Sequence, residues 1–139
     1  MRLLTRALLA LAVLSLASLA LAQAAFDWTP ASEESVIEVL TADADGDLRE
    51  TPVWIVVIDG AGFVRTTDSK WLANIRRRSP VRVRVRNVES AMVASEVADA
   101  ALRARVEAAF KEKYGMLQRA MSLFRMREPV VLKLAPRSS

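Results

Sequence analysis

The chain contains no histidine and no cysteine among its 139 residues. Without these side chains, Ser-His-Asp and Cys-His nucleophilic catalysis, ordinary zinc sites and haem ligated by histidine or cysteine are excluded. Disulfide bonds and lipidation on cysteine are excluded as well, so the domain must be held together by its apolar core. Carboxylates remain available for acid–base chemistry, but no pair of them is singled out by its spacing.

Three alternating aspartates, Asp43, Asp45 and Asp47, resemble the first half of a calcium-binding EF-hand loop. Such a loop requires a glycine after its third acidic position and a glutamate at its twelfth, where this chain has Trp54. The sequence therefore predicts no metal site. Residues 42–48 are interpreted as a polar hairpin turn.

The first 24 residues have the composition of a secretory signal. Arg2 and Arg6 precede an Ala/Leu-rich run, and overlapping A-x-A sites predict cleavage after Ala22 or Ala24. We therefore expect an exported protein, either periplasmic or secreted. The alternative is an uncleaved leader that anchors the protein in a membrane, because the charge-free stretch over residues 7–26 is about long enough to span a bilayer.

The composition, with 53% hydrophobic and 26% charged residues, is that of one globular domain. We expect a polar lead-in over residues 25–34, the domain over residues 35–135 and a loose tail over residues 136–139. Removing Arg2 and Arg6 with the leader leaves 18 basic and 16 acidic residues, which reduces the net charge from +4 to +2. Such a balance does not by itself argue for a nucleic-acid partner.

Six apolar or β-branched segments bounded by turn residues predict strands. For the first of them a short helix capped by Ser32 is an alternative. The valines and arginines that alternate after Pro80 place the valines on one face of a strand and the arginines on the other. The predicted strands are residues 35–41, 51–58, 63–67, 81–85, 91–97 and 130–134, with turns at residues 59–62 and 87–90.

Helical patterns occupy three of the remaining segments. One helix is expected from a cap at Thr67 or Asp68 to about residue 78, a second over residues 98–114 that ends at Gly115, and a short third over residues 116–125. Short antiparallel strands with few helices predict an α+β fold, with about six strands in a small barrel or sheet and two or three peripheral helices.

The arginine run over residues 76–86 is the main concentration of charge. A solvated edge explains it, and no aromatic residues interleave to support binding of nucleic acid. An anionic ligand is the other use considered, since Arg84 and Lys70 would converge on a phosphate beside the helix that begins near Ser69. Trp54 and Trp71 flank this position, either as core residues or as stacking faces for a planar heteroaromatic ligand.

The segment TPVWIVVIDGAGFVRTTDSKWLANI, followed by SPVRVRV, resembles the pyridoxamine-phosphate-oxidase-like split β-barrels that bind flavin or deazaflavin. The arrangement of Trp71, Asn74, Pro80, Val81 and Val83 is most similar to the deazaflavin-dependent nitroreductase branch. This resemblance implies a small split β-barrel that forms a homodimer, with its cofactor in a groove at the dimer interface.

The resemblance also implies site residues. Arg65, Thr67, Ser69 and Lys70 would hold the phosphate of FMN or of a deazaflavin. Pro52, Val53 and Trp54 would lie beside the ring, and Trp71 and Asn74 match the motif in either a binding or a structural role. With Arg84 added from the charge pattern, these ten positions form the predicted cofactor site.

The expected function is therefore that of an exported flavin- or deazaflavin-binding oxidoreductase acting on a small molecule, the cofactor supplying the redox chemistry. The alternative is a non-enzymatic periplasmic or secreted binding module that has lost the cofactor. No catalytic residue is assigned. No nucleic acid is expected as a partner, and contact with a membrane is expected only through an uncleaved leader.

Overall fold

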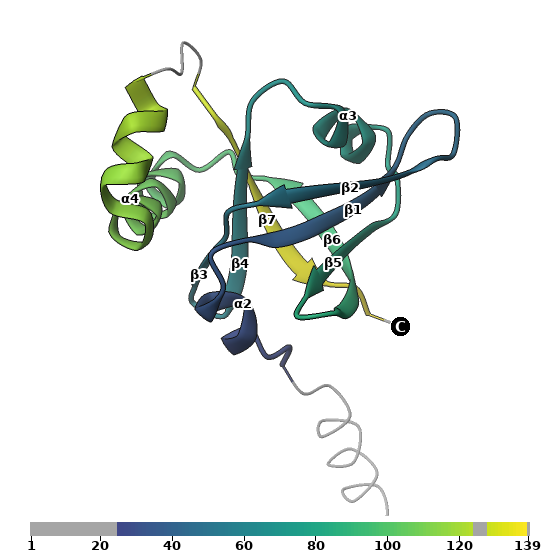
Figure 1. Cartoon of the computed structure of the whole chain (residues 1–139), viewed down its shortest axis with the longest axis horizontal. Helices are drawn as coiled ribbons and strands as arrows, with labels where there is room; N and C mark the ends of the chain where they lie inside the picture. The colour runs from purple at the N-terminus through teal and green to yellow at the C-terminus, as the bar shows by residue number, and fades with distance from the viewer. Residues whose placement is uncertain (1–24, 124–127, 139) are drawn as a thin grey trace, which may run out of the picture.

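The computed structural model describes residues 25–123 and 128–138, which form a curled antiparallel sheet with three helices around it (Figure 1). This confirms the predicted α+β fold, with seven strands in the described residues instead of about six. The expected leader and the expected end of the last helix lie outside the described residues. The strands are β1 (Ile37–Ala42), β2 (Leu48–Val53), β3 (Val56–Ile58), β4 (Ala61–Thr66), β5 (Val81–Val85), β6 (Val88–Glu96) and β7 (Val130–Pro136), and the helices are α2 (Thr29–Glu33), α3 (Lys70–Arg76) and α4 (Ala100–Leu123).

The order of strands across the sheet is β2-β1-β5-β6-β7-β4-β3, and every neighbouring pair is antiparallel. The two edge strands, β2 and β3, are separated in sequence by Trp54 and Ile55 alone. Since so short a connection spans only about 10 Å, the sheet has to curl until its edges approach each other. Figure 1 shows this half-barrel, with α2 and α3 at opposite ends and α4 beside it.

The prediction of one strand over residues 51–58 is wrong. Val53 pairs with Ile37 of β1, whereas Val56 pairs with Phe63 of β4, so the chain changes partner strands between them. At this crossover the Ile55 N–H donates to the hydroxyl of Tyr114 at 3.0 Å instead of to a neighbouring strand. The apolar run continues from Val53 through the change to Ile58, so the local pattern gives no sign of it.

Two hairpins are closed by tighter turns than predicted. Asp59 and Gly60 have φ angles of 50° and 73°, and Arg86 and Asn87 have φ angles of 50° and 66°. Two successive left-handed residues are typical of the two-residue turns whose twist matches that of the flanking strands. The predicted turn at residues 59–62 is therefore too long. The turn predicted at residues 87–90 lies too late in the chain, since β6 begins as early as Val88.

The lead-in over residues 25–34, which the sequence predicts to be polar, contributes side chains to the core. The side chain of Trp28 is buried just before α2, together with Ala31. A Cβ atom at Gly62 would lie only 2.5 Å from the Trp28 ring, so the absence of a side chain in β4 makes room for the indole. The first described residues thus close one end of the half-barrel.

Helix α3 begins one residue later than predicted. Its cap is Ser69, whose hydroxyl oxygen accepts a hydrogen bond from the backbone N–H of Leu72 at 3.2 Å. Helix α4 covers the outer side of β3, β4 and β7, where Val106 and Phe110 pack on Phe63 and Val131. The predicted break at Gly115 is present as a kink, because this glycine has a φ angle of 54° and interrupts the helix.

Candidate functional site

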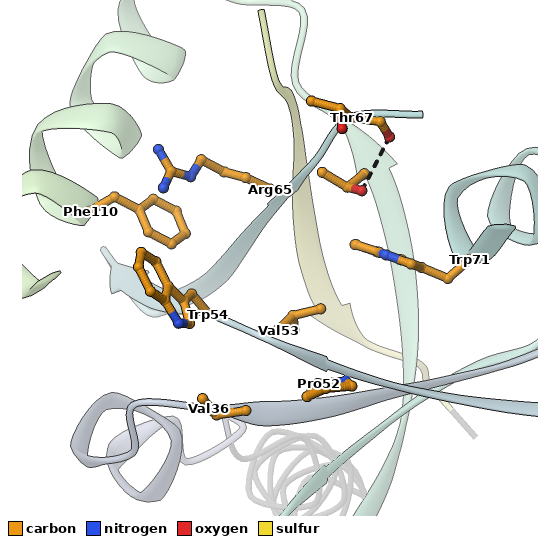
Figure 2. A pocket seen from close by; sticks show the side chains of 9 residues that line it. Val36, Pro52, Val53, Trp54, Arg65, Thr67, Trp71 and Phe110 are labelled. Carbon is orange, nitrogen blue, oxygen red and sulfur yellow. Dashed lines mark hydrogen bonds between the residues drawn. The ribbon is translucent and has the colours of Figure 1, made fainter. Parts of the chain in front are cut away.

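A pocket of about 440 Å³ opens where α4, β4, β2 and α3 approach one another. Its volume lies within the range usual for small-molecule sites. Figure 2 shows aromatic side chains around it, with Phe110 on α4, Trp71 on α3 and Trp54 just after β2. The lining residues are Val36, Pro52, Val53, Trp54, Arg65, Thr66, Thr67, Trp71 and Phe110.

Trp54 borders the pocket because it lies in the crossover between β2 and β3. Its neighbour Ile55 is fully buried, so Trp54 is left on the side that borders the pocket. Behind it, the ring of Tyr114 stacks on the indole with a centroid distance of 4.2 Å and an angle of 4°. Tyr114 does not line the pocket itself, and its ring supports the indole of Trp54, which does.

Arg65 is the charged residue of the lining. Its side chain is only 5% exposed, and Nη1 lies 2.5 Å from a carboxylate oxygen of Glu107 on α4. The guanidinium carbon also lies 3.9 Å from the centre of the Phe110 ring. An arginine held over an aromatic face in this way is favoured electrostatically, so the pocket has a fixed cation whose charge is partly offset by the carboxylate of Glu107.

The end of β4 supplies hydroxyl groups to the same wall. The Thr66 hydroxyl lies within donating distance of the Ser69 hydroxyl oxygen, at 2.9 Å, and of the Thr67 carbonyl oxygen, at 3.1 Å. Thr67 itself borders the pocket. The Ser69 hydroxyl is therefore engaged both with β4 and with the start of α3.

The structure brings six of the ten predicted site residues into this pocket. They are Pro52, Val53, Trp54, Arg65, Thr67 and Trp71.

The other four predicted residues lie elsewhere. Ser69 caps α3, and Lys70 borders other hollows beside that helix, one of them between α3 and the turn that follows β1. The buried amide of Asn74 donates to Thr41 at 3.0 Å and to Asp43 at 2.8 Å, which gives it a structural role.

Arg84 and Lys70 do not converge on a common site, contrary to the prediction. It lies on the outer face of β5, where it bonds the carboxylates of Glu38, Glu50 and Glu89. These partners raise the pKa of the guanidinium, with Glu50 the largest contributor. The arginine that the charge pattern singled out is thus saturated by its neighbours on the sheet.

Val36, Thr66 and Phe110 were missed from the sequence. Val36 precedes β1, and nothing in its local pattern indicates that it faces a cavity. Phe110 falls within the predicted helix over residues 98–114, but an amphipathic pattern does not tell which side chain of a helix will border a pocket.

Two groups behind the pocket have altered proton affinities. Burial raises the pKa of the Tyr114 hydroxyl, because the phenolate would be poorly solvated there. Burial likewise lowers the pKa of Lys113, whose ammonium group donates to the carbonyl oxygens of Glu34 and Ile55 at 2.7 and 2.8 Å. Both groups therefore favour their neutral forms more than exposed groups would.

In the part of the chain that the structure describes, no cluster of three His, Cys, Asp or Glu residues is placed to hold a metal ion. Across the same residues, no helix combines the length and apolar character required to cross a membrane.

Residues 29–131 match a family described as an uncharacterized protein conserved in bacteria, DUF2255. The chain belongs to the DUF2255 family. A comparison with curated proteins found no match.

Solved structures share the fold of this DUF2255 protein. The haem storage protein HutZ from Vibrio cholerae is 19% identical with a TM-score of 0.63, and the match covers 77% of this chain and 84% of HutZ. An FAD-binding protein from Mesorhizobium loti is 13% identical with a TM-score of 0.57, over 78% of this chain and 83% of that one.

A third similar structure is a protein of the pyridoxinephosphate oxidase family from Clostridium acetobutylicum, related to a general stress protein. It is 11% identical with a TM-score of 0.58, and the match covers 77% of this chain and 78% of that chain. At such low identities the likeness concerns the fold. It confirms the predicted split β-barrel fold, and the resemblance to the nitroreductase branch stays a prediction.

Proposed function

We propose that this DUF2255 protein binds a planar, anionic small molecule of the flavin class, FMN or a deazaflavin, as the cofactor of an oxidoreductase acting on a small substrate. One observation carries the proposal: a pocket of about 440 Å³ has Trp54 and Trp71 in its lining together with the buried cation of Arg65. Large aromatic faces favour a flat ring. A guanidinium group favours a phosphate attached to it.

The residues fit such a ligand in two ways. Trp54 and Trp71 provide apolar surface for a ring system, and Arg65 with Thr67 provides donors for an anionic chain. When bound, the flavin would supply hydride transfer. The protein would bind and orient the ring and shield it from water.

The names of the similar structures support this ligand class, since one is FAD-binding and another belongs to the pyridoxinephosphate oxidase family. Haem, named for HutZ, is also planar and anionic. However, this sequence has no histidine or cysteine to ligate the iron, and the hydroxyl of Tyr114 is already bonded to the Ile55 N–H. We therefore favour flavin over haem.

The direct test is a titration of the purified protein with FMN, a deazaflavin, riboflavin and haemin, followed by fluorescence or absorbance. We expect FMN or the deazaflavin to bind, and Trp54→Ala to weaken that binding by roughly tenfold or more because a stacking face is lost. Leu48→Ala is the matched control, since Leu48 is an exposed apolar residue that does not line the pocket. Binding of haemin alone, or equal binding by both variants, contradicts the proposal.

Riboflavin separates the ring from the phosphate. If Arg65 holds the phosphate, Arg65→Met should reduce the preference for FMN over riboflavin while leaving riboflavin affinity nearly unchanged. An unchanged preference would show that the anionic group is held elsewhere.

A binding module without turnover is the second candidate. It is favoured by the composition of the pocket wall, because Arg65 is the single titratable side chain among the nine lining residues and provides no general acid or base near pH 7. Turnover of a nitroaromatic probe by the flavin-loaded protein with a hydride donor distinguishes the two functions. Binding without turnover supports the module.

We further propose that the protein acts outside the cytoplasm and as a homodimer. The basis is the leader, with its A-x-A sites near Ala22 and Ala24, and the resemblance to split barrels that pair around their cofactor. Fractionation of cells together with the N-terminal residue of the isolated protein tests export. Light scattering of the same material tests the dimer.

A further inference from the structure

The last turn of α4 before Gly115 contacts the crossover between the two edge strands. Lys113 and Tyr114 extend from this turn and reach the backbone of residues 34, 35 and 55. The crossover carries Trp54, which lines the proposed ligand pocket. The two residues therefore lie behind the pocket wall without being part of it.

Tyr114 makes two kinds of contact there. Its hydroxyl accepts from the Ile55 N–H at 3.0 Å and lies within donating distance of the carbonyl oxygens of Ser35 and Ile55, at 2.8 and 3.1 Å. Its ring stacks on Trp54 at 4.2 Å and lies 5.7 Å from the ring of Phe110 at an angle of 20°. One side chain thus contacts both the backbone and the aromatic lining of the crossover.

Lys113 reinforces the same junction. Its ammonium group bridges the carbonyl oxygens of Glu34, before β1, and of Ile55, between β2 and β3. Carbonyl groups at a strand break have no ladder partner and require a donor from elsewhere. The cation provides that donor for two chain segments at once.

We infer that Tyr114 is a positioning residue of the ligand pocket and that Lys113 assists it: the Tyr114 ring fixes the orientation of Trp54 and Phe110, so that the pocket presents a preformed aromatic wall to a planar ligand. The inference about ligand selection rests on the proposed function. The inference about Trp54 orientation concerns the protein alone and is tested without ligand.

The ligand-free test uses protein labelled with 5-fluorotryptophan, whose three fluorine resonances are assigned with single Trp→Phe variants. Tyr114→Leu removes the stacked ring and is expected to broaden or split the Trp54 resonance, because the indole then adopts more than one orientation, while Trp28 and Trp71 keep single sharp resonances. Val106→Ala is the matched control, because Val106 is buried on the same helix but does not line the pocket. A single Trp54 resonance in Tyr114→Leu that is as sharp as in the wild type overturns the inference.

The second test measures affinity for FMN. Tyr114→Leu is expected to weaken binding about tenfold, the effect of losing one aromatic pair. Tyr114→Phe keeps the ring and should lose less, and Lys113→Met should also lose less. Val106→Ala should bind as the wild type does, even if its thermal stability falls as far as that of Tyr114→Leu.

A double-mutant cycle separates positioning from general destabilisation. If Tyr114 acts through Trp54, Tyr114→Leu should have little further effect on FMN affinity in a Trp54→Leu background. Fully additive losses reject the positioning role. If the wild type binds no flavin, the proposed function fails, and the fluorine spectra still decide whether Tyr114 orients Trp54.

Discussion

Two outward-facing surfaces of the same curled sheet carry arginines in different surroundings. On β4, Arg65 lies beneath α4, with its side chain 5% exposed and its guanidinium group over the ring of Phe110. On β5, Arg84 lies on a face that no described helix covers, with its side chain 26% exposed among Glu38, Glu50 and Glu89. We call these the covered face and the bare face.

The difference shows that a covering helix determines how strongly an arginine interacts with its partners. Under α4 the charge is desolvated, so its interaction with Glu107, and that with the ligand proposed above, is strengthened by the low local dielectric. On the bare face water and salt screen the ion pairs, whose individual contributions to stability are small. Arg82 and Arg84, the part of the arginine run that lies on β5, are consequently on the face less suited to binding a small molecule.

The largest expected effect is on the covered face at Phe110, which is fully buried against β4 and β7. Phe110→Ala should lower the free energy of unfolding by about 3–5 kcal/mol, because it leaves a cavity beneath α4. Urea denaturation measures this. On the bare face, Val93→Ala is the control: its side chain is 52% exposed and its loss should change stability by less than about 0.5 kcal/mol.

The next effect compares the two arginines by the same substitution. Arg65→Met should lower the free energy of unfolding by about 2 kcal/mol, because the carboxylate of Glu107 loses its partner in a partly desolvated setting. Arg84→Met should have a clearly smaller effect, since its partners are left in water. Equal losses in urea denaturation would remove the distinction between the two faces.

A pH titration tests the ion pair between Asp43 and Arg49, which lies beside α3. The hydrogen bond from Arg49, followed by that from Asn74, lowers the pKa of Asp43 from its usual 3.8 to about 2. Its contribution to stability is therefore present above about pH 3.8 and is lost as the pH falls towards 2. Between these values the urea midpoint of the wild type should fall more than that of Asp43→Asn, and parallel curves would contradict the assignment.

The smallest expected effect is that of salt on the bare face. The difference in stability between wild type and Arg84→Met should shrink in 1 M NaCl, where the screening length is only about 3 Å. The corresponding difference for Arg65→Met should change less, because the pair is shielded by α4. Paired urea curves at low and high salt check this prediction.

Much of the fold was predictable from short stretches of sequence. The alternation of valine and arginine after Pro80 correctly gave β5 with its two faces, and Gly115 correctly marked the break in α4. Six of the ten proposed site residues lie together in one pocket. These features follow from conformational preferences that act over a few residues.

The errors arose where distant segments decide the outcome. The strand predicted over residues 51–58 is divided because Tyr114, 59 residues away from Ile55, satisfies the backbone at the crossover. Trp28 belongs to the core because Gly62 leaves space for it. Neither of these two contacts can be read from the sequence around either residue.

By itself, the sequence determined the type and approximate place of most elements and excluded histidine and cysteine chemistry. Only the tertiary structure decided that Arg65 and not Arg84 borders a pocket, and that Tyr114 supports Trp54. The physical reason is one of range: backbone propensity and side-chain alternation are set by neighbours in the chain. Burial, ion pairing and ring stacking depend on which surfaces the curled sheet brings together.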